Sequence, residues 1–182
     1  MPQPPSTPVP PPARRGRFVS KRDISIEIFE SPDGLMSVYA TFLDPYHLIR
    51  LDLTVDPNSK EILAAHAEMA NHPHSLCPLV TVKAQELVGL NVGRGVMKEI
   101  SRRIGGGAGC VHLRELSMEA VNFIATAVIG YDNGYGVMSR EFNAMPEEER
   151  YRLSKEHLRG TCQIFQGGET AGPRVDSEVE SQ

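Results

Sequence analysis

The sequence predicts an α+β fold: an antiparallel four-stranded meander followed by helices packed on one face of the sheet. Two observations lead to this fold class. Four segments with alternating apolar and polar residues come first and are joined by short turns, and segments with helical apolar spacing come only after them. Because strands precede helices instead of alternating with them, we expect an antiparallel sheet with one covered face.

The strands are predicted from the alternation of their side chains. They fall within residues 24–28, 36–42, 47–55 and 63–69, with turns at 31–34 and 56–59 that are rich in Pro, Asp, Asn, Gly and Ser. In the fourth segment the apolar residues from Leu63 to Met69 are odd-numbered. Since side chains of a strand alternate between its two faces, these odd-numbered residues are expected to face the core.

Helices are predicted over residues 82–88, 94–104, 112–129 and 146–159, with a loop over 130–136. The third is the longest amphipathic segment and follows the glycine-rich run 105–109. Glycines at this point let the chain turn tightly between two helices. The run also resembles a phosphate cradle, but it lacks the Gly-Lys-Ser/Thr ending of a P-loop.

Composition divides the chain into three parts. Residues 1–22 are predicted to form a Pro-rich and basic disordered arm, residues 23–165 a single α+β domain, and residues 166–182 an acidic disordered tail. The arm carries the cations Arg14, Arg15, Arg17, Lys21 and Arg22. This basic cluster fits either contact with phosphate or, more commonly, a solvated linker.

Charge and hydropathy exclude several function classes. The net charge of −4 argues against a nucleic-acid binder. No apolar stretch approaches the ~20 residues that span a bilayer, and the Pro-rich start lacks the apolar region of a signal peptide. A cytoplasmic protein is therefore predicted, and its three cysteines are expected to be free thiols or metal ligands.

A set of soft and borderline ligand atoms lies at the predicted element boundaries. Cys110 and His112 open the longest helix, Cys77 follows the fourth strand, and His47 begins the third strand in register with its inward-facing residues. Cys, Cys, His and His suit zinc, and they also suit iron. The sequence therefore predicts a zinc or iron site formed by His47, Cys77, Cys110 and His112.

Other interpretations of the same residues stay open. Cys77 and Cys110 also fit small buried apolar residues, and His112 fits a helix cap. Cys110 at a helix start also fits a nucleophile with His47 or His112 as its base, although residues two apart on a helix do not face each other. His72 and His74 form a His-x-His pair that could hold metal by itself. Cys162 follows the last helix and fits either packing or approach to the site.

Two carboxylates are candidate catalytic residues. Glu68 lies near the end of the fourth strand, where a general base or an acceptor for a ligand imidazole could sit. Glu115 follows His112 by about one helical turn and could orient it. Both positions also fit solvated surface carboxylates.

The chain resembles the bacterial family known as domain of unknown function 2889 over about residues 23–165. The resemblance rests on Asp44-Pro45-Tyr46-His47, Ala67-Glu68-Met69, Cys77-Pro78, Leu87-Val88-Gly89-Leu90, Gly109 through Leu116 and Gly160-Thr161-Cys162. Val111, where the family pattern has Thr, is a departure. The resemblance implies that Cys77, Cys110 and His112 belong to the family pattern, and it raises the expectation of a metal. A looser, fold-level similarity links the chain to iron–sulfur scaffold proteins.

Three functional hypotheses follow. The first is a cytosolic metal-binding protein, acting as a metal-dependent lyase or hydrolase on a small organic molecule, with Glu68 as proton carrier. Tyr46, Tyr131 and Tyr135 are the candidate walls for an aromatic substrate. The second is a non-catalytic metal or iron–sulfur carrier that docks on a partner enzyme. The third is a metal-free structural or regulatory module. The predicted partners are a small-molecule substrate or a partner enzyme, and the sequence does not determine the oligomeric state.

Overall fold

The sheet has the meander topology that the sequence predicts. The computed structural model describes residues 16–133, 140–155, 158–160 and 165. Its strands are β1 (Asp23–Glu30), β2 (Met36–Leu43), β3 (Leu48–Asp56) and β4 (Glu61–Asn71). They lie in the order β1-β2-β3-β4, and every neighbouring pair is antiparallel. The α+β class and the strand order are therefore confirmed.

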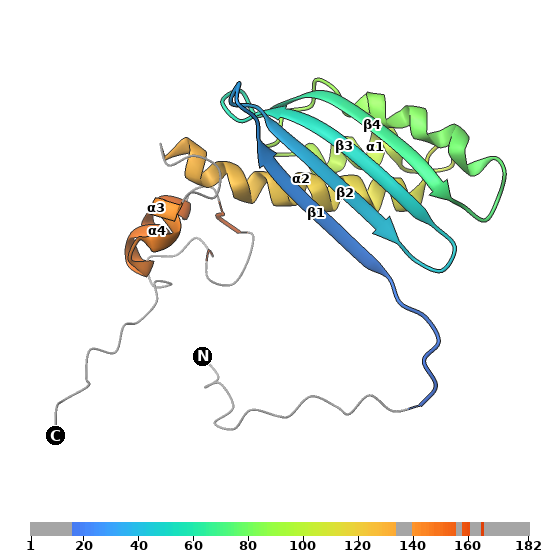
Figure 1. The fold of residues 1–182 in the computed structure, drawn as a ribbon. Coiled ribbons are helices and arrows are strands. Elements are labelled where there is room, and N and C mark those ends of the chain that lie inside the picture. The colour runs from blue at the N-terminus through green and yellow to red at the C-terminus, as the bar shows by residue number, and fades with distance from the viewer. Residues whose placement is uncertain (1–15, 134–139, 156–157, 161–164, 166–182) are drawn as a thin grey trace.

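Helices cover one face of this sheet (Figure 1). The long helix α2 (Val111–Asp132) packs on β1, β2 and β3, while the 3-10 helix η1 (Cys77–Leu87) packs on β4. The helix α1 (Val96–Ile104) contacts both η1 and α2. The short helices α3 (Arg140–Ala144) and α4 (Glu147–Ser154) follow beyond the end of α2. No helix in the described part of the chain is both long and apolar enough to cross a membrane.

The core lies between the sheet and the helices. Alternate residues of β2 and β3 are fully or almost fully buried, which gives these central strands their strict inside–outside pattern. From the helical side, Leu113, Leu116, Ala120 and Ile124 of α2 meet this surface and have no exposed area. This packing fixes the start of α2 against the end of β2 and the start of β3.

The helix boundaries differ from the prediction in three places. The predicted helix at 82–88 is the end of the longer η1, which begins at Cys77 with Pro78 in its first turn. The predicted loop at 130–136 begins later, because α2 continues through Asp132. The last predicted helix, 146–159, is the shorter α4, and α3 was not predicted. Residues 134–139 and 161–164, with Tyr135 and Cys162, lie outside the described residues.

At the start of β4, the side chain that faces the core is not the one that the sequence predicts. Leu63 was expected to face the core, but it is 43% exposed, whereas Ile62 is fully buried. The cause is an irregularity in the β3–β4 ladder, where Val55 pairs with Ile62 and Thr54 pairs with Ala64, so that Leu63 is the extra residue of a β-bulge. The backbone of Ile62 also exchanges hydrogen bonds with Gly89 and Leu90 after η1.

The bulge predicts that alanine substitutions at Ile62 and Leu63 lower the stability of the protein by different amounts. Ile62→Ala should lower the free energy of unfolding by about 2–5 kcal/mol, because it leaves a cavity in the core. Leu63→Ala should lower it by less than about 1 kcal/mol, because the side chain is half exposed. Urea denaturation followed by circular dichroism measures both values. The reverse ranking would show that the regular alternation, with Leu63 inside, is the true register.

Candidate metal centre

The turn between β2 and β3 is held by one carboxylate. Asp44 Oδ1 accepts hydrogen bonds from the backbone amides of Tyr46 at 2.9 Å and His47 at 2.8 Å. The same oxygen lies 3.0 Å from Nδ1 of the His47 ring. Both side chains are largely buried, with 9% of Asp44 and 12% of His47 exposed. Asp44 therefore fixes both the backbone of the turn and the orientation of the imidazole.

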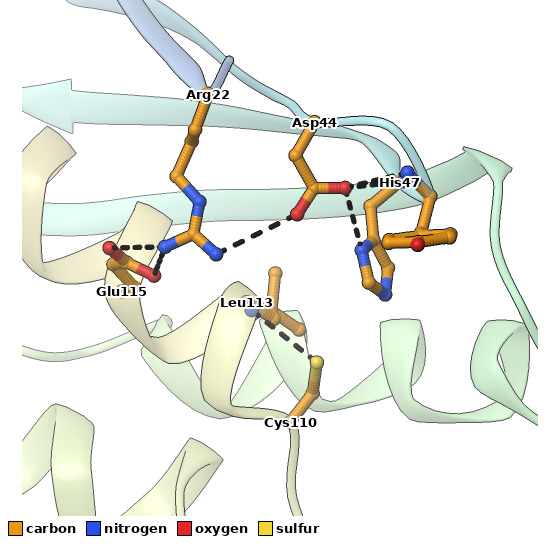
Figure 2. A network of polar contacts seen from close by, with 7 residues as sticks. Arg22, Asp44, His47, Cys110, Leu113 and Glu115 are labelled. Carbon is orange, nitrogen blue, oxygen red and sulfur yellow. Dashed lines mark hydrogen bonds and ion pairs between the residues drawn. The ribbon is translucent and has the colours of Figure 1, made fainter. Parts of the chain in front are cut away.

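The start of α2 is fixed by Cys110 and supplies a second imidazole, that of His112. Cys110 is the N-cap residue of this helix, and its Sγ accepts a hydrogen bond from the amide of Leu113 at 3.5 Å (Figure 2). The chain enters the cap through Gly109, where a Cβ atom would lie only 1.7 Å from the carbonyl oxygen of Ile104. Only glycine fits this close approach. The capping role considered for His112 thus belongs to Cys110, and the ring of His112 faces His47.

Three ligand-bearing side chains meet at this point. One ligand atom from each of Asp44, His47 and His112 lies within 4.8 Å of the other two. The rings of His47 and His112 have their centroids 4.2 Å apart, and the ring of Phe42 lies 5.1 Å from that of His112. Phe42 is fully buried, and its ring packs against both imidazoles. We call Asp44, His47 and His112 the triad.

The surroundings shift two of the pKa values of the triad. Burial, and then the neighbouring His47, lower the pKa of His112 from its ordinary value of 6.5. For Asp44, burial acts to raise the pKa, but hydrogen bonds from the Tyr46 amide and from the ring and amide of His47 together hold it below 3.8. The site therefore favours a neutral His112 beside an ionised Asp44, the protonation states that ligate a cation.

Arg22 connects the triad to α2. Its guanidinium lies 3.6 Å from Asp44 Oδ2 and 3.3 Å from Glu115 Oε2, so it bridges two carboxylates (Figure 2). It also lies 4.8 Å from the centroid of the Phe42 ring, in cation–π geometry. Arg22 is the last residue of the predicted arm. Its contacts join the segment before β1 to the site.

The two imidazoles of the triad line a groove between β4, η1 and the start of α2, whereas Asp44 does not line it. The groove has a volume of about 670 Å³. All four predicted metal ligands line it, namely His47, Cys77, Cys110 and His112. The remaining lining residues are Met69, Pro73, His74, Leu76, Val80, Gly109 and Val111. Cys77 and Cys110 are free thiols, and they lie outside the compact triad.

Neither of the two predicted catalytic carboxylates, Glu68 and Glu115, lines the groove. Glu68 is on the open face of the sheet, paired with Arg50 at 2.6 Å across the strands. It neighbours Met69, which lines the groove, so its side chain points to the opposite face. Glu115 does lie near the triad, but it pairs with Arg22 and is not one of the residues that line the groove.

Neither described tyrosine among the predicted aromatic walls lines the groove, and the third, Tyr135, lies outside the described residues. Tyr46 is 66% exposed, and neither it nor Tyr131 is among the described residues that line the groove. The hydroxyl of Tyr131 lies near Gly34, in the β1–β2 turn. The β1–β2 turn and the β2–β3 turn are at opposite ends of β2, so Tyr131 is far from the triad along the sheet. The walls are aliphatic instead.

Comparison with known proteins supports the family resemblance. The sequence profile of the family described as "Protein of unknown function (DUF2889)" matches residues 20–126. The chain belongs to this family. The matched range includes the triad, Arg22, both thiols of the groove and Glu115, so the whole candidate site lies within the family's region. No curated protein and no solved structure matches the chain, and the similarity to iron–sulfur scaffold proteins stays a prediction.

Sequence reasoning missed Asp44 and Arg22 as site residues. The sequence does contain a feature that points to Asp44, because this residue begins the Asp-Pro-Tyr-His segment that carries the family resemblance. An Asp three residues before a His is also well placed for an Asx-type turn. No comparable feature points to Arg22, since it lies in a basic segment with the composition of a linker. Its nearest partner on α2, Glu115, is 93 residues away.

The lowered pKa of His112 predicts a pH dependence of stability in the metal-free protein. Its folded-state pKa lies below the unfolded value, so the unfolded chain binds more protons in the range between the two. The stabilising contribution is present above about pH 6.5 and is lost as the pH falls through the lowered folded-state pKa of His112. His112→Gln should flatten this part of the curve, whereas His66→Gln, an exposed histidine on the open face, should not.

Denaturant titrations in the presence of a chelator measure this dependence. Asp44 adds a separate loss below about pH 4, because its pKa is also lowered in the folded state and its contribution disappears when it is protonated. If the slope of stability against pH just below about pH 6.5 is the same in His112→Gln as in the wild type, the assignment to His112 is contradicted.

Proposed function

We propose that this protein binds one divalent transition metal ion, zinc or iron, at the triad and acts on a small organic molecule as a metal-dependent lyase or hydrolase. The observation that carries the proposal is the convergence of Asp44, His47 and His112, whose ligand atoms lie within 4.8 Å of one another. The two imidazoles also line a groove. Two imidazoles and one carboxylate are a ligand set of catalytic zinc and of non-haem iron.

The hydrogen bonds of the triad indicate which atoms take part. His47 Nδ1 is engaged with Asp44 Oδ1, so Nε2 is its free nitrogen. Asp44 Oδ1 receives three hydrogen bonds, and among the described residues the polar partner of Oδ2 is Arg22, at 3.6 Å. Asp44 thus fixes the tautomer of His47, as carboxylates do beside metal-bound histidines, and its Oδ2 is the oxygen left to approach a cation.

The open side of the site favours catalysis over a purely structural role. Structural zinc sites are closed by four protein ligands, whereas catalytic sites leave a position for water or substrate. Here three ligands converge among the described residues, and two of them, His47 and His112, line a groove. A bound metal would polarise a carbonyl or hydroxyl oxygen placed in that groove. Within the groove, His74, Cys77 and Cys110 are the titratable groups that remain for proton transfer.

A second candidate function rests on the two thiols. Because Cys77 and Cys110 line the same groove as both imidazoles, movement of their side chains could close a Cys-Cys-His-His shell, the ligand set that the sequence predicts. A closed shell would suit a non-catalytic metal carrier that docks on a partner enzyme. The two functions therefore differ in whether sulfur binds the metal.

Metal content tests the proposal. Wild-type protein purified without chelator is expected to hold about one metal ion per chain, by elemental analysis. His47→Ala and His112→Ala should lose it. Asp44→Asn should weaken metal affinity by at least about 10–100-fold, which is the cost of losing a carboxylate that only orients a ligand. His66→Ala is the matched control and should keep full occupancy, because His66 is exposed on the open face of β4. Circular dichroism verifies that each variant is folded.

A metal-free wild type that is neither stabilised nor occupied after incubation with zinc or iron would contradict the proposal and favour a metal-free regulatory module. Equal metal loss in His66→Ala would show that the binding is adventitious.

The spectrum of the cobalt-substituted protein separates the two functions. The thiols lie outside the triad, so we expect no sulfur-to-cobalt charge-transfer absorption in the near ultraviolet. Cys77→Ser and Cys110→Ser should keep the cobalt spectrum of the wild type. A charge-transfer band that disappears in both variants, but persists in Cys162→Ser, would instead establish thiol ligation and favour the carrier.

A further inference from the structure

We propose that the groove beside the triad binds a small molecule that has an uncharged apolar body and an oxygen-donor head group, with the head directed at the metal. This inference deepens the proposed function and rests on it for the position of the head. The body would lie between η1, the end of β4 and the start of α2. The argument comes from the walls, the charge and the rim of the groove.

The walls of the groove away from the triad are mainly aliphatic. Met69 contributes from β4, Val80 from η1 and Val111 from the first turn of α2, and Pro73 and Leu76 come from the segment between β4 and η1. Apolar walls with a few convergent polar groups at one end are the usual design of a small-molecule site. Here the polar end is formed by His47, His112 and the thiols.

The charge of the groove limits the kind of molecule that fits. None of its described lining residues is Lys, Arg, Asp or Glu. A nucleotide or a sugar phosphate would bring several negative charges without a cation to pair with them, and burying an unpaired charge is costly. Among the described lining residues, His74 is the only imidazole besides the two of the triad, and the other residues away from the triad are mainly apolar. The body of the molecule is therefore expected to be uncharged.

The rim carries apolar side chains that face solvent. Leu76 is 72% exposed and Val111 is 58% exposed, and both line the groove. A ligand body lying in the groove would remove part of this surface from water, which is favourable. The volume of the groove, about 670 Å³, falls within the range of roughly 300–1,000 Å³ that is common for small-molecule sites.

A pair of hydroxamates tests the inference on the zinc-loaded protein. Benzohydroxamate and acetohydroxamate share the metal-binding head and differ only in the apolar body. Isothermal titration calorimetry should show benzohydroxamate binding about tenfold more tightly, because its ring would be covered by the groove. Equal affinities would overturn the proposal.

Two leucines supply matched variants. Leu76 lines the groove, whereas Leu79 is similarly exposed, at 69%, but does not line it. Leu76→Asp should reduce the preference for benzohydroxamate by about fivefold or more, and Leu79→Asp should leave it unchanged. Because both side chains are mostly exposed, neither change should unfold the protein. Equal effects of the two substitutions would place the ligand body elsewhere.

A readout that does not depend on the metal separates the two proposals. With ¹³C-methyl-labelled methionine, the resonance of Met69, assigned from Met69→Leu, should shift when benzohydroxamate is added. If the protein takes up no zinc but the Met69 resonance still shifts, the metal function fails and the groove remains a binding site for the apolar body. If zinc binds and the resonance does not move, the groove proposal fails and the metal function stands.

Discussion

The candidate site depends on the hydrogen bonds of the Asp44 carboxylate. One oxygen of this side chain satisfies two backbone amides of the β2–β3 turn and the ring of His47. A largely buried carboxylate is stable only when such partners replace water. The side chain that closes the turn also favours one tautomer and one orientation of the imidazole, so the turn and the position of His47 depend on the same carboxylate.

The second imidazole reaches this point because of how α2 is packed. The helix lies across β1, β2 and β3, and Leu113, next to His112, is fully buried against the sheet. The tight glycine entry and the thiol cap of Cys110 fix where the helix begins. Since interiors are densely packed, a shift of α2 along the sheet would disturb many contacts at once. The distance between the two rings is thus set by the core.

The sequence predicted the topology well because alternation and turn chemistry are local signals. The four strands, their order and the covered face follow directly from them. The four predicted ligand residues line one groove, and their joint binding of a metal stays a prediction. The compact triad was not predicted. It replaces two thiols with Asp44, whose role depends on a three-residue turn geometry that periodicity does not encode. The β-bulge at Leu63 was also missed, because an extra residue in a strand depends on its neighbours: the β3 ladder and the chain after η1.

The bridge made by Arg22 has a consequence for where this domain starts. A shortened protein beginning at β1 would retain every strand and every helix of the covered sheet, yet Asp44 and Glu115 would lose the cation between them. Asp44 would keep only the hydrogen bonds to its Oδ1, and Glu115 would lose its ion pair with Arg22. The smallest fragment with an intact electrostatic environment at the triad therefore extends at least one residue upstream of the sheet.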